Sequence, residues 1–198
     1  SWIIEDDYDS EYRFAGAPLT ALAGLGSERV IYIGTFTKTL FAGLRLAYLV
    51  LPTELVTRVT AARAAIDRFP PRFMQDAVAA LMADGTLASH TRRMRTRYRE
   101  ARDVVVEALR ETAKDVIRVG GPPQGLHLVA ALPEGVTTAT AIAIRDAADI
   151  DCKLMSDTRL TASGPEGFIL GYSGHGIAEL RDSARRLGRA ANAKLQAK

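Results

Sequence analysis

Lys38 is the residue whose surroundings suggest chemistry most strongly. It lies in Thr35–Leu40, just after a stretch rich in β-branched and aromatic residues. A lysine that forms a Schiff base must be partly desolvated, because its ammonium form is otherwise too stable to react. The hydroxyls of Thr35 and Thr37 could donate hydrogen bonds to a phosphate, and Arg45 could bind two of its oxygens at once. The alternative is a solvated turn lysine, with Arg45 as an exposed charge on a strand.

A second group of polar residues follows an earlier expected strand, Trp2–Glu5. Asp6 lies at the carboxyl end of this strand, where ligands gather in open α/β sheets. Its carboxylate could pair with a pyridinium nitrogen and keep that ring protonated as an electron sink, and Tyr8 could donate to a phenolic oxygen of the same ring. The alternatives are a solvated acidic loop or a loose divalent-cation site. Because the spacing is not that of an EF-hand and no histidine is near, we predict no metal.

Periodicity and turn residues give the elements that must position these side chains. The expected strands are 2–5, 29–34, 44–51, 125–132 and 168–173, and the expected helices are about 53–66, 73–83, 86–114, 138–148 and 178–196. Thr53 is the expected N-cap of the first helix, which Phe69-Pro70-Pro71 should end. The long helix carries one apolar face at Met94, Tyr98, Ala101, Val105 and Ala108.

This order of elements predicts an α/β protein in two parts. We expect a partial large domain over residues 1–85, followed over 86–198 by the long connecting helix and a small α/β domain. The first expected strand begins almost at residue 1, and a parallel strand needs a crossover partner. We therefore expect the chain to be part of a longer protein.

The composition is that of an ordinary globular protein and excludes several classes. Of the 198 residues, 47% are hydrophobic and 25% are charged. The longest apolar run is far shorter than the ~20 residues that span a bilayer. The first residues lack the features of a secretory signal, and the single cysteine, Cys152, excludes an internal disulfide. These observations predict a cytoplasmic protein in a reducing compartment, with Cys152 as a buried small side chain.

Two further features have alternative interpretations. Arg92–Arg99 contains five arginines, which could face phosphates but more often form the solvated side of an amphipathic helix. The three histidines, His90, His127 and His175, lie far apart in the sequence and have no metal-ligand spacing. We expect core or capping roles for them, although His175 follows the last strand and could lie near a cleft.

Several segments together resemble the aminotransferase-like domain of MocR-type bacterial transcription regulators, which belong to the GntR superfamily. The segments are Ile4–Arg13 (IEDDYDSEYR), Tyr32–Leu40 (YIGTFTKTL), Leu44–Pro52 (LRLAYLVLP), His90–Tyr98 (HTRRMRTRY) and Gly125–Leu128 (GLHL). The resemblance covers nearly the whole chain. The first two motifs together are highly specific, and the arginine-rich stretch favours regulators over ordinary enzymes.

The resemblance implies a fold and a set of roles. The fold would be the C-terminal part of a pyridoxal-phosphate-dependent fold-type-I aminotransferase-like domain. Lys38 would hold pyridoxal 5'-phosphate as a Schiff base, Asp6 would pair with the ring nitrogen, and Tyr8 would contact the phenolic oxygen. Thr35, Thr37 and Arg45 would bind the phosphate. Full-length members form homodimers, bind DNA through an N-terminal winged helix-turn-helix, and sense an amino compound or the cofactor itself.

Two departures from the family pattern affect the functional prediction. Nothing upstream of the Asp6 strand is present, so the cofactor could be absent from this chain alone. The last expected strand, Phe168–Ser173, has no arginine where many aminotransferases hold the substrate carboxylate, although Arg159 could substitute from a loop. The leading interpretation is therefore an effector-sensing domain. The alternatives are a genuine class I/II aminotransferase and a cofactor-free dimerisation remnant; Tyr8 directly after Asp7, where many such enzymes have proline, counts against the enzyme.

Overall fold

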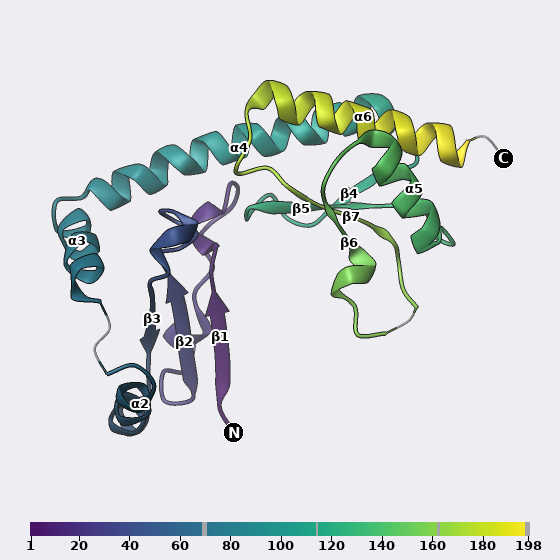
Figure 1. The fold of residues 1–198 in the computed structure, drawn as a ribbon. Helices are drawn as coiled ribbons and strands as arrows, with labels where there is room; N and C mark the ends of the chain where they lie inside the picture. The colour runs from purple at the N-terminus through teal and green to yellow at the C-terminus, as the bar shows by residue number, and fades with distance from the viewer. Residues whose placement is uncertain (69–70, 114, 162, 197–198) are drawn as a thin grey trace. The chain divides into compact units, whose positions relative to one another are not determined.

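A computed structural model describes residues 1–68, 71–113, 115–161 and 163–196 of the chain (Figure 1). Its internal contacts form two compact units, Ser1–Met94 and Arg95–Lys198. Helix α4 (Thr86–Ala113) contributes residues to both units. The domain boundary that the sequence predicts, at residue 86, lies at the start of this shared helix and stays a prediction.

The first unit is built on a three-stranded sheet in the order β1-β2-β3. Its strands are β1 (Ile3–Asp7), β2 (Val30–Thr35) and β3 (Ala47–Val50). Strands β1 and β2 are parallel, with Asp7 opposite Gly34, whereas β3 runs antiparallel to β2, with Ala47 opposite Thr35. Short helices follow the first strand, η1 (Ser10–Tyr12) and α1 (Leu22–Leu25). The two expected strands 2–5 and 29–34 are thus confirmed with small shifts of their ends.

Strand β3 is shorter than the sequence predicts. Residues Ala42–Leu44 form a 3-10 helix, η2, and Arg45 caps it in the left-handed conformation, with φ of 50°. Leu44 is buried by this turn. The apolar run 44–51 is therefore divided between a turn and a strand, which hydrophobicity alone does not reveal.

Gly34 is required by a close approach between β2 and β3. A Cβ atom at this position would lie 2.3 Å from Cζ of Tyr48, the residue opposite it in the ladder. The Tyr48 ring crosses Gly34 and lies near two other rings, with centroids 6.1 Å from Tyr32 and 5.4 Å from Phe36. An aromatic side chain that covers a glycine on the neighbouring strand fixes the register of the pair.

Two helices follow the sheet in the first unit, α2 (Thr53–Ile66) and α3 (Arg72–Ala83). The prediction that Thr53 is the N-cap is wrong by one position, because Pro52 occupies the cap and Thr53 is the first helical residue. Part of the predicted break at Phe69-Pro70-Pro71 lies outside the described residues. Gly85, at φ of 77°, separates α3 from α4 as expected, since glycine adopts this conformation without strain.

Helix α4 confirms the predicted long amphipathic helix. Ala101, Val105 and Ala108 are buried, and Met94 and Tyr98 are half-buried, as their spacing predicts. The five arginines of Arg92–Arg99 are all exposed. Their exposure agrees with the solvated-face interpretation of this run.

The second unit is an antiparallel sheet with helices. Its strands are β4 (Arg118–Gly120), β5 (His127–Ala131), β6 (Lys153–Leu154) and β7 (Gly167–Gly171), in the order β4-β5-β7-β6, and its other elements are α5 (Thr138–Ala148), η3 (Met155–Thr158) and α6 (Ile177–Leu195). Leu128, Ile144, Phe168 and Leu187 are among the buried side chains that join sheet and helices. The sequence did not predict β4 and β6. These strands have only three and two residues, respectively, which is too short for a periodic pattern of apolar residues.

No helix in the described part of the chain is long and apolar enough to cross a membrane.

Candidate functional site

The sheet of the first unit brings the predicted site residues to one edge. Because β1 and β2 are parallel, Asp6 and Thr35 lie at carboxyl ends that point the same way, and Lys38 follows Thr35 in the next turn. Strand β3 starts at this edge because it runs antiparallel, so Arg45 lies two residues before its first residue, Ala47. Topology therefore gathers side chains from three separate segments at the strand ends, where open α/β sheets bind ligands.

Lys38 lies in a tight turn that begins as β2 ends. The Phe36 amide donates to the Leu46 carbonyl at 3.0 Å, and the Leu40 amide donates to the Phe36 carbonyl at 2.9 Å, which closes one helical turn. Lys38 is exposed, as the alternative of a solvated turn lysine predicts, so the residues of this chain do not themselves supply the desolvation that a Schiff-base lysine needs. Among the described residues its side chain has no hydrogen bond or ion pair, so the ammonium group is available to a ligand.

The two threonines of this segment differ in how their hydroxyls are used. Thr35 Oγ1 donates to the Leu46 carbonyl at 3.3 Å and accepts from the Thr37 amide at 3.1 Å. Its only proton is therefore engaged, and donation to a phosphate would require the hydroxyl to rotate away from Leu46. No described partner engages the Thr37 hydroxyl. Thr37 is the better placed of the two to donate, while Thr35 shapes the turn.

Asp6 and Tyr8 are both exposed and close enough to interact electrostatically. The carboxylate of Asp9, partial burial and the carboxylate of Asp6 all raise the pKa of the Tyr8 hydroxyl. Tyr8 therefore stays protonated at neutral pH and can donate a hydrogen bond. A tyrosine donor beside a carboxylate suits a ring that carries both an oxygen acceptor and a protonated nitrogen.

Arg45 is exposed, and its backbone occupies a region that few residues other than glycine adopt. It lines a hollow of about 520 Å³ in the first unit, together with Tyr48, Arg63 and Gln75. Arg63 pairs with Asp67 at 2.7 Å, whereas Arg45 has no acidic partner among the described residues. Residues in strained backbone conformations cluster at functional sites. A guanidinium without an acidic partner in such a turn is therefore a candidate for ligand binding.

Asp7 is a structural acid of this edge that the sequence analysis did not single out. It accepts from the Tyr32 hydroxyl at 2.7 Å and from the backbone and hydroxyl of Ser10 at 3.2 and 2.7 Å. Burial and the hydrogen bond to Asp7 raise the pKa of Tyr32 well above its usual range. These bonds fix the end of β1 and the turn that leads to η1. Successive side chains of a strand point to opposite faces, so Asp6 and Asp7 must lie on different sides of the sheet. This alternation was the signal in the sequence that could have separated their roles.

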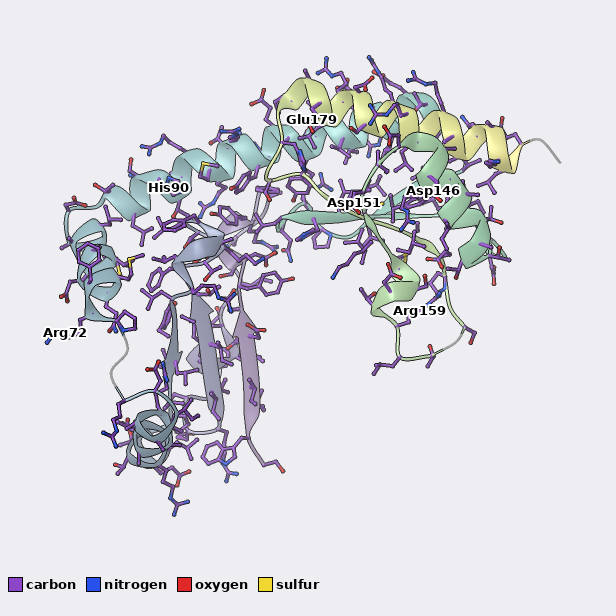
Figure 2. The ribbon with its side chains drawn as sticks, viewed as in Figure 1. Arg72, His90, Asp146, Asp151, Arg159 and Glu179 are labelled. Atoms are coloured by element: carbon purple, nitrogen blue, oxygen red, sulfur yellow. The ribbon has the colours of Figure 1, made fainter. Side chains whose placement is uncertain are left out.

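Tyr12 and His90 also contact the Lys38 turn and were not predicted to do so. The Tyr12 hydroxyl donates to the Lys38 carbonyl at 3.4 Å, and His90 Nε2 lies 3.0 Å from the Thr39 carbonyl. His90 belongs to α4 (Figure 2). Both partners are distant from Lys38 in the sequence, so no local pattern could have revealed them.

Arg159, the predicted substitute for a substrate-binding arginine, is engaged inside the second unit (Figure 2). Its guanidinium donates to the Pro165 carbonyl at 2.7 Å and pairs with Glu166 at 3.5 Å. Burial by itself would raise the pKa of Glu166, but hydrogen bonds from Thr138, Gly167 and Ser156 outweigh it and lower the pKa. Arg159 thus neutralises a buried carboxylate, and we do not assign it to a substrate.

The remaining candidates have structural or solvated positions. His127 is exposed on β5, and exposed His175 lies 3.1 Å from Glu179 on α6. Cys152 is half-buried, and this burial raises the pKa of its thiol to about 11, so the thiol is unreactive at neutral pH. In the parts of the chain that the structure describes, no group of three or more potential ligands could hold a metal ion.

The donor set at the first unit's edge fits pyridoxal phosphate. It supplies a lysine amine, a carboxylate for a ring nitrogen, a protonated tyrosine and a guanidinium for a phosphate. Among the described residues, the charged groups of Lys38, Asp6 and Arg45 have no ion-pair partners. Unpaired charges of both signs at one strand edge are the arrangement that a zwitterionic, phosphorylated ligand would neutralise.

The fold is that of the pyridoxal-phosphate-dependent aminotransferases of fold type I. The solved α-aminoadipate aminotransferase LysN from Thermus thermophilus, complexed with N-(5'-phosphopyridoxyl)-L-leucine, superimposes with a TM-score of 0.88. Its sequence is 26% identical, and the match covers 100% of this chain and 51% of LysN. The predicted fold class is thereby confirmed.

Sequence relatives agree with the fold. The profile of the "Aminotransferase class I and II" family matches residues 10–164, and the chain belongs to this family. It is 34% identical over 188 residues to the probable rhizopine catabolism regulatory protein MocR of Rhizobium meliloti, covering 94% of this chain and 38% of that protein. It is 32% identical over 190 residues to the HTH-type transcriptional regulator YhdI of Bacillus subtilis, covering 94% and 40%. The resemblance to MocR-type regulators is confirmed, and the chain spans about two fifths of these relatives.

Membership of the aminotransferase class I and II family implies that the chain depends on pyridoxal phosphate.

Proposed function

We propose that this chain is the effector-sensing, pyridoxal-phosphate-binding domain of a MocR-type transcription regulator, with the cofactor held on Lys38. The observation that carries the proposal is the convergence of Lys38, Asp6 and Arg45 on one strand edge, in a chain whose relatives include transcription regulators. Pyridoxal phosphate, when bound, supplies an aldehyde that captures amines and a ring that withdraws electrons.

The residues of the chain would divide the work of holding this group. The Lys38 amine would anchor it covalently, and the carboxylate of Asp6 would keep the ring nitrogen protonated. Tyr8, whose hydroxyl stays protonated, would donate to the phenolic oxygen. Thr37 and Arg45 would bind the phosphate, with Thr35 joining only after its hydroxyl leaves the Leu46 carbonyl.

A sensing role is favoured over turnover by the second unit. Strand β7 (GFILG) carries no arginine, and the guanidinium of Arg159 is engaged by Glu166 and the Pro165 carbonyl. Capture of an amine requires only that an amino compound compete with the Lys38 amine. Complete transamination also requires a firmly held substrate carboxylate and a proton shuttle. In the intact protein the signal would pass to DNA through a winged helix-turn-helix, in a homodimeric, cytoplasmic regulator that responds to an amino compound or to the cofactor.

The second candidate function is a genuine aminotransferase. It is favoured by the family match and by the likeness to LysN. A third candidate is a remnant that dimerises without cofactor.

One experiment separates the three. The intact protein is incubated with pyridoxal phosphate, treated with borohydride, and digested, and the modified peptide is located by mass spectrometry. Amino acids are then supplied while absorbance and keto-acid release are followed. Sensing predicts attachment at Lys38 and spectral change without sustained keto acid. Sustained keto-acid release would establish the enzyme instead, and the absence of any attachment would leave only the remnant.

A further inference from the structure

The turn that carries Lys38 ends with backbone carbonyls that the turn itself cannot satisfy. Its single helical hydrogen bond, from the Leu40 amide to the Phe36 carbonyl, uses the first carbonyl only. In a longer helix the following carbonyls would accept from later amides, but here the chain leaves the helical path after Leu40. The carbonyls of Lys38 and Thr39 therefore need donors from elsewhere in the first unit.

Tyr12 supplies the first of these donors. Its side chain is completely buried, and its hydroxyl lies 3.4 Å from the Lys38 carbonyl and 3.5 Å from the Thr39 carbonyl. Tyr12 ends η1, whose start is fixed by the hydrogen bonds from Ser10 to Asp7. The segment that follows β1 thus holds the buried Tyr12 hydroxyl against the backbone carbonyls of the Lys38 turn.

His90 supplies the second donor, from the beginning of α4 (Figure 2). Its Nε2 lies 3.0 Å from the Thr39 carbonyl, and the acceptor is a carbonyl, so the ring nitrogen must carry the proton. Both the imidazolium and the Nε2-protonated neutral ring meet this requirement. Thr39 itself is only 5% exposed, and its hydroxyl donates back to the Phe36 carbonyl at 3.3 Å.

We propose that Tyr12 and His90 are positioning residues, which fix the backbone beneath Lys38 so that its exposed amine is presented to the cofactor in one orientation. The inference rests on the proposed role of Lys38. All the bonds described here hold main-chain atoms of residues 36–40, while the Lys38 side chain keeps no described partner. A fixed backbone under a free reactive group is preorganisation, because the group reaches its reacting geometry without ordering the loop.

The His90 contact gives α4 a direct hydrogen bond to the turn that carries Lys38. His90 lies in the first unit, yet its helix continues without interruption to Ala113 in the second. A displacement of the Lys38 turn on amine capture would therefore alter a hydrogen bond on a helix that both units share.

The test uses variants of the intact protein that remove one donor while keeping its shape. Tyr12→Phe deletes the phenolic hydroxyl, and His90→Leu deletes the imidazole donor. His90→Gln retains an N–H near the position of Nε2. The matched control is Tyr172→Phe, since Tyr172 is equally buried in the second unit and its hydroxyl donates to the Gly125 carbonyl at 2.6 Å.

Urea unfolding measures the global stability of each variant, and two readouts are compared among variants of equal stability. The first is the rate at which pyridoxal phosphate becomes attached to Lys38, trapped with borohydride. The second is amide hydrogen exchange of residues 36–40 in the cofactor-free protein. The double variant Tyr12→Phe/His90→Leu should attach the cofactor roughly tenfold more slowly, because both donors to the backbone beneath Lys38 are lost. Exchange in 36–40 should accelerate, His90→Gln should restore much of the rate, and Tyr172→Phe should change neither readout.

The outcomes separate this inference from the proposed function. If the wild-type protein attaches cofactor at Lys38 and the double variant does so at the same rate, with unchanged exchange, the positioning role is wrong while the proposed function stands. If the wild-type protein attaches nothing at Lys38, the proposed function fails. In that case amide hydrogen exchange alone tests the positioning role. Unchanged protection of residues 36–40 in the double variant would show that Tyr12 and His90 do not hold the turn.

Discussion

Replacing Arg45 with glycine should separate the backbone cost of this residue from its proposed role in binding. Arg45 has φ of 50°, a conformation that costs an L-residue roughly 1–2 kcal/mol and costs glycine almost nothing. Glycine loses about 0.5–1 kcal/mol more chain entropy on folding. Arg45→Gly should therefore leave the free energy of unfolding between unchanged and about 1.5 kcal/mol higher.

The same substitution should weaken cofactor binding. A charge-assisted hydrogen bond contributes about 1.5–3 kcal/mol, which corresponds to a roughly 10- to 150-fold loss of affinity for pyridoxal phosphate. Arg45→Ala should weaken binding to the same extent but should not gain stability, since alanine keeps the strain.

The assay is fluorescence titration with pyridoxal phosphate beside urea unfolding, both on the intact protein. Asp149→Gly is the control, because Asp149 has φ of 51° in the second unit, where relief of strain should not affect binding. Unchanged affinity in Arg45→Gly would refute the phosphate role. A marked loss of stability in cofactor-free Arg45→Gly would refute the inference that the left-handed backbone of Arg45 is strained.

Substitutions at Lys38, Gly34 and Glu166 test the attachment site, the register of the first sheet and the buried carboxylate of the second unit. Lys38→Ala should abolish covalent attachment of the cofactor without affecting circular dichroism, while Lys153→Ala, at an exposed lysine of β6, should leave attachment intact. Gly34→Ala should destabilise the first unit by about 1–3 kcal/mol, seen as a lower urea midpoint, because its Cβ would meet the Tyr48 ring at 2.3 Å. The hydrogen bonds of Glu166 lower its pKa in the folded state below that in the unfolded state, so they stabilise the protein above the ordinary glutamate range and this stability is lost as the pH falls. Glu166→Gln should be less stable at neutral pH by about 1–3 kcal/mol and should lose less stability on acidification, and equal pH profiles in urea titrations would contradict this account.

The longer elements could be predicted from the sequence because their periodicity is strong. Helix α5 was predicted with its observed bounds, Thr138–Ala148, and the apolar positions of α4 are buried or half-buried as expected. The prediction failed where a turn interrupts an apolar run. Leu44 is buried through a 3-10 turn and not through a strand, and the left-handed Arg45 that ends this turn has no signature in the residue type.

The candidate site was predictable as far as it is local in sequence. Lys38, its flanking threonines and Arg45 lie within a short segment, and the strand that precedes Asp6 could be recognised from its apolar residues. The contacts of Tyr12 and His90 depend on tertiary structure, because they join residues separated by 26 and 51 positions. The use of the Thr35 hydroxyl within its own turn was likewise hidden, since a threonine that binds a ligand and one that braces the backbone look identical in sequence.

The continuity of α4 has a consequence for anyone who wishes to study the two halves separately. The junction between Met94 and Arg95 lies inside a 28-residue helix, so a cut made there would break the backbone hydrogen bonds that cross it and create two frayed ends. One fragment would lose the turns that support His90, and the other would lose the start of the helix that buries Ala101 and Val105. Expression of either half should therefore retain the whole helix, through Ala113 for the first and from Thr86 for the second.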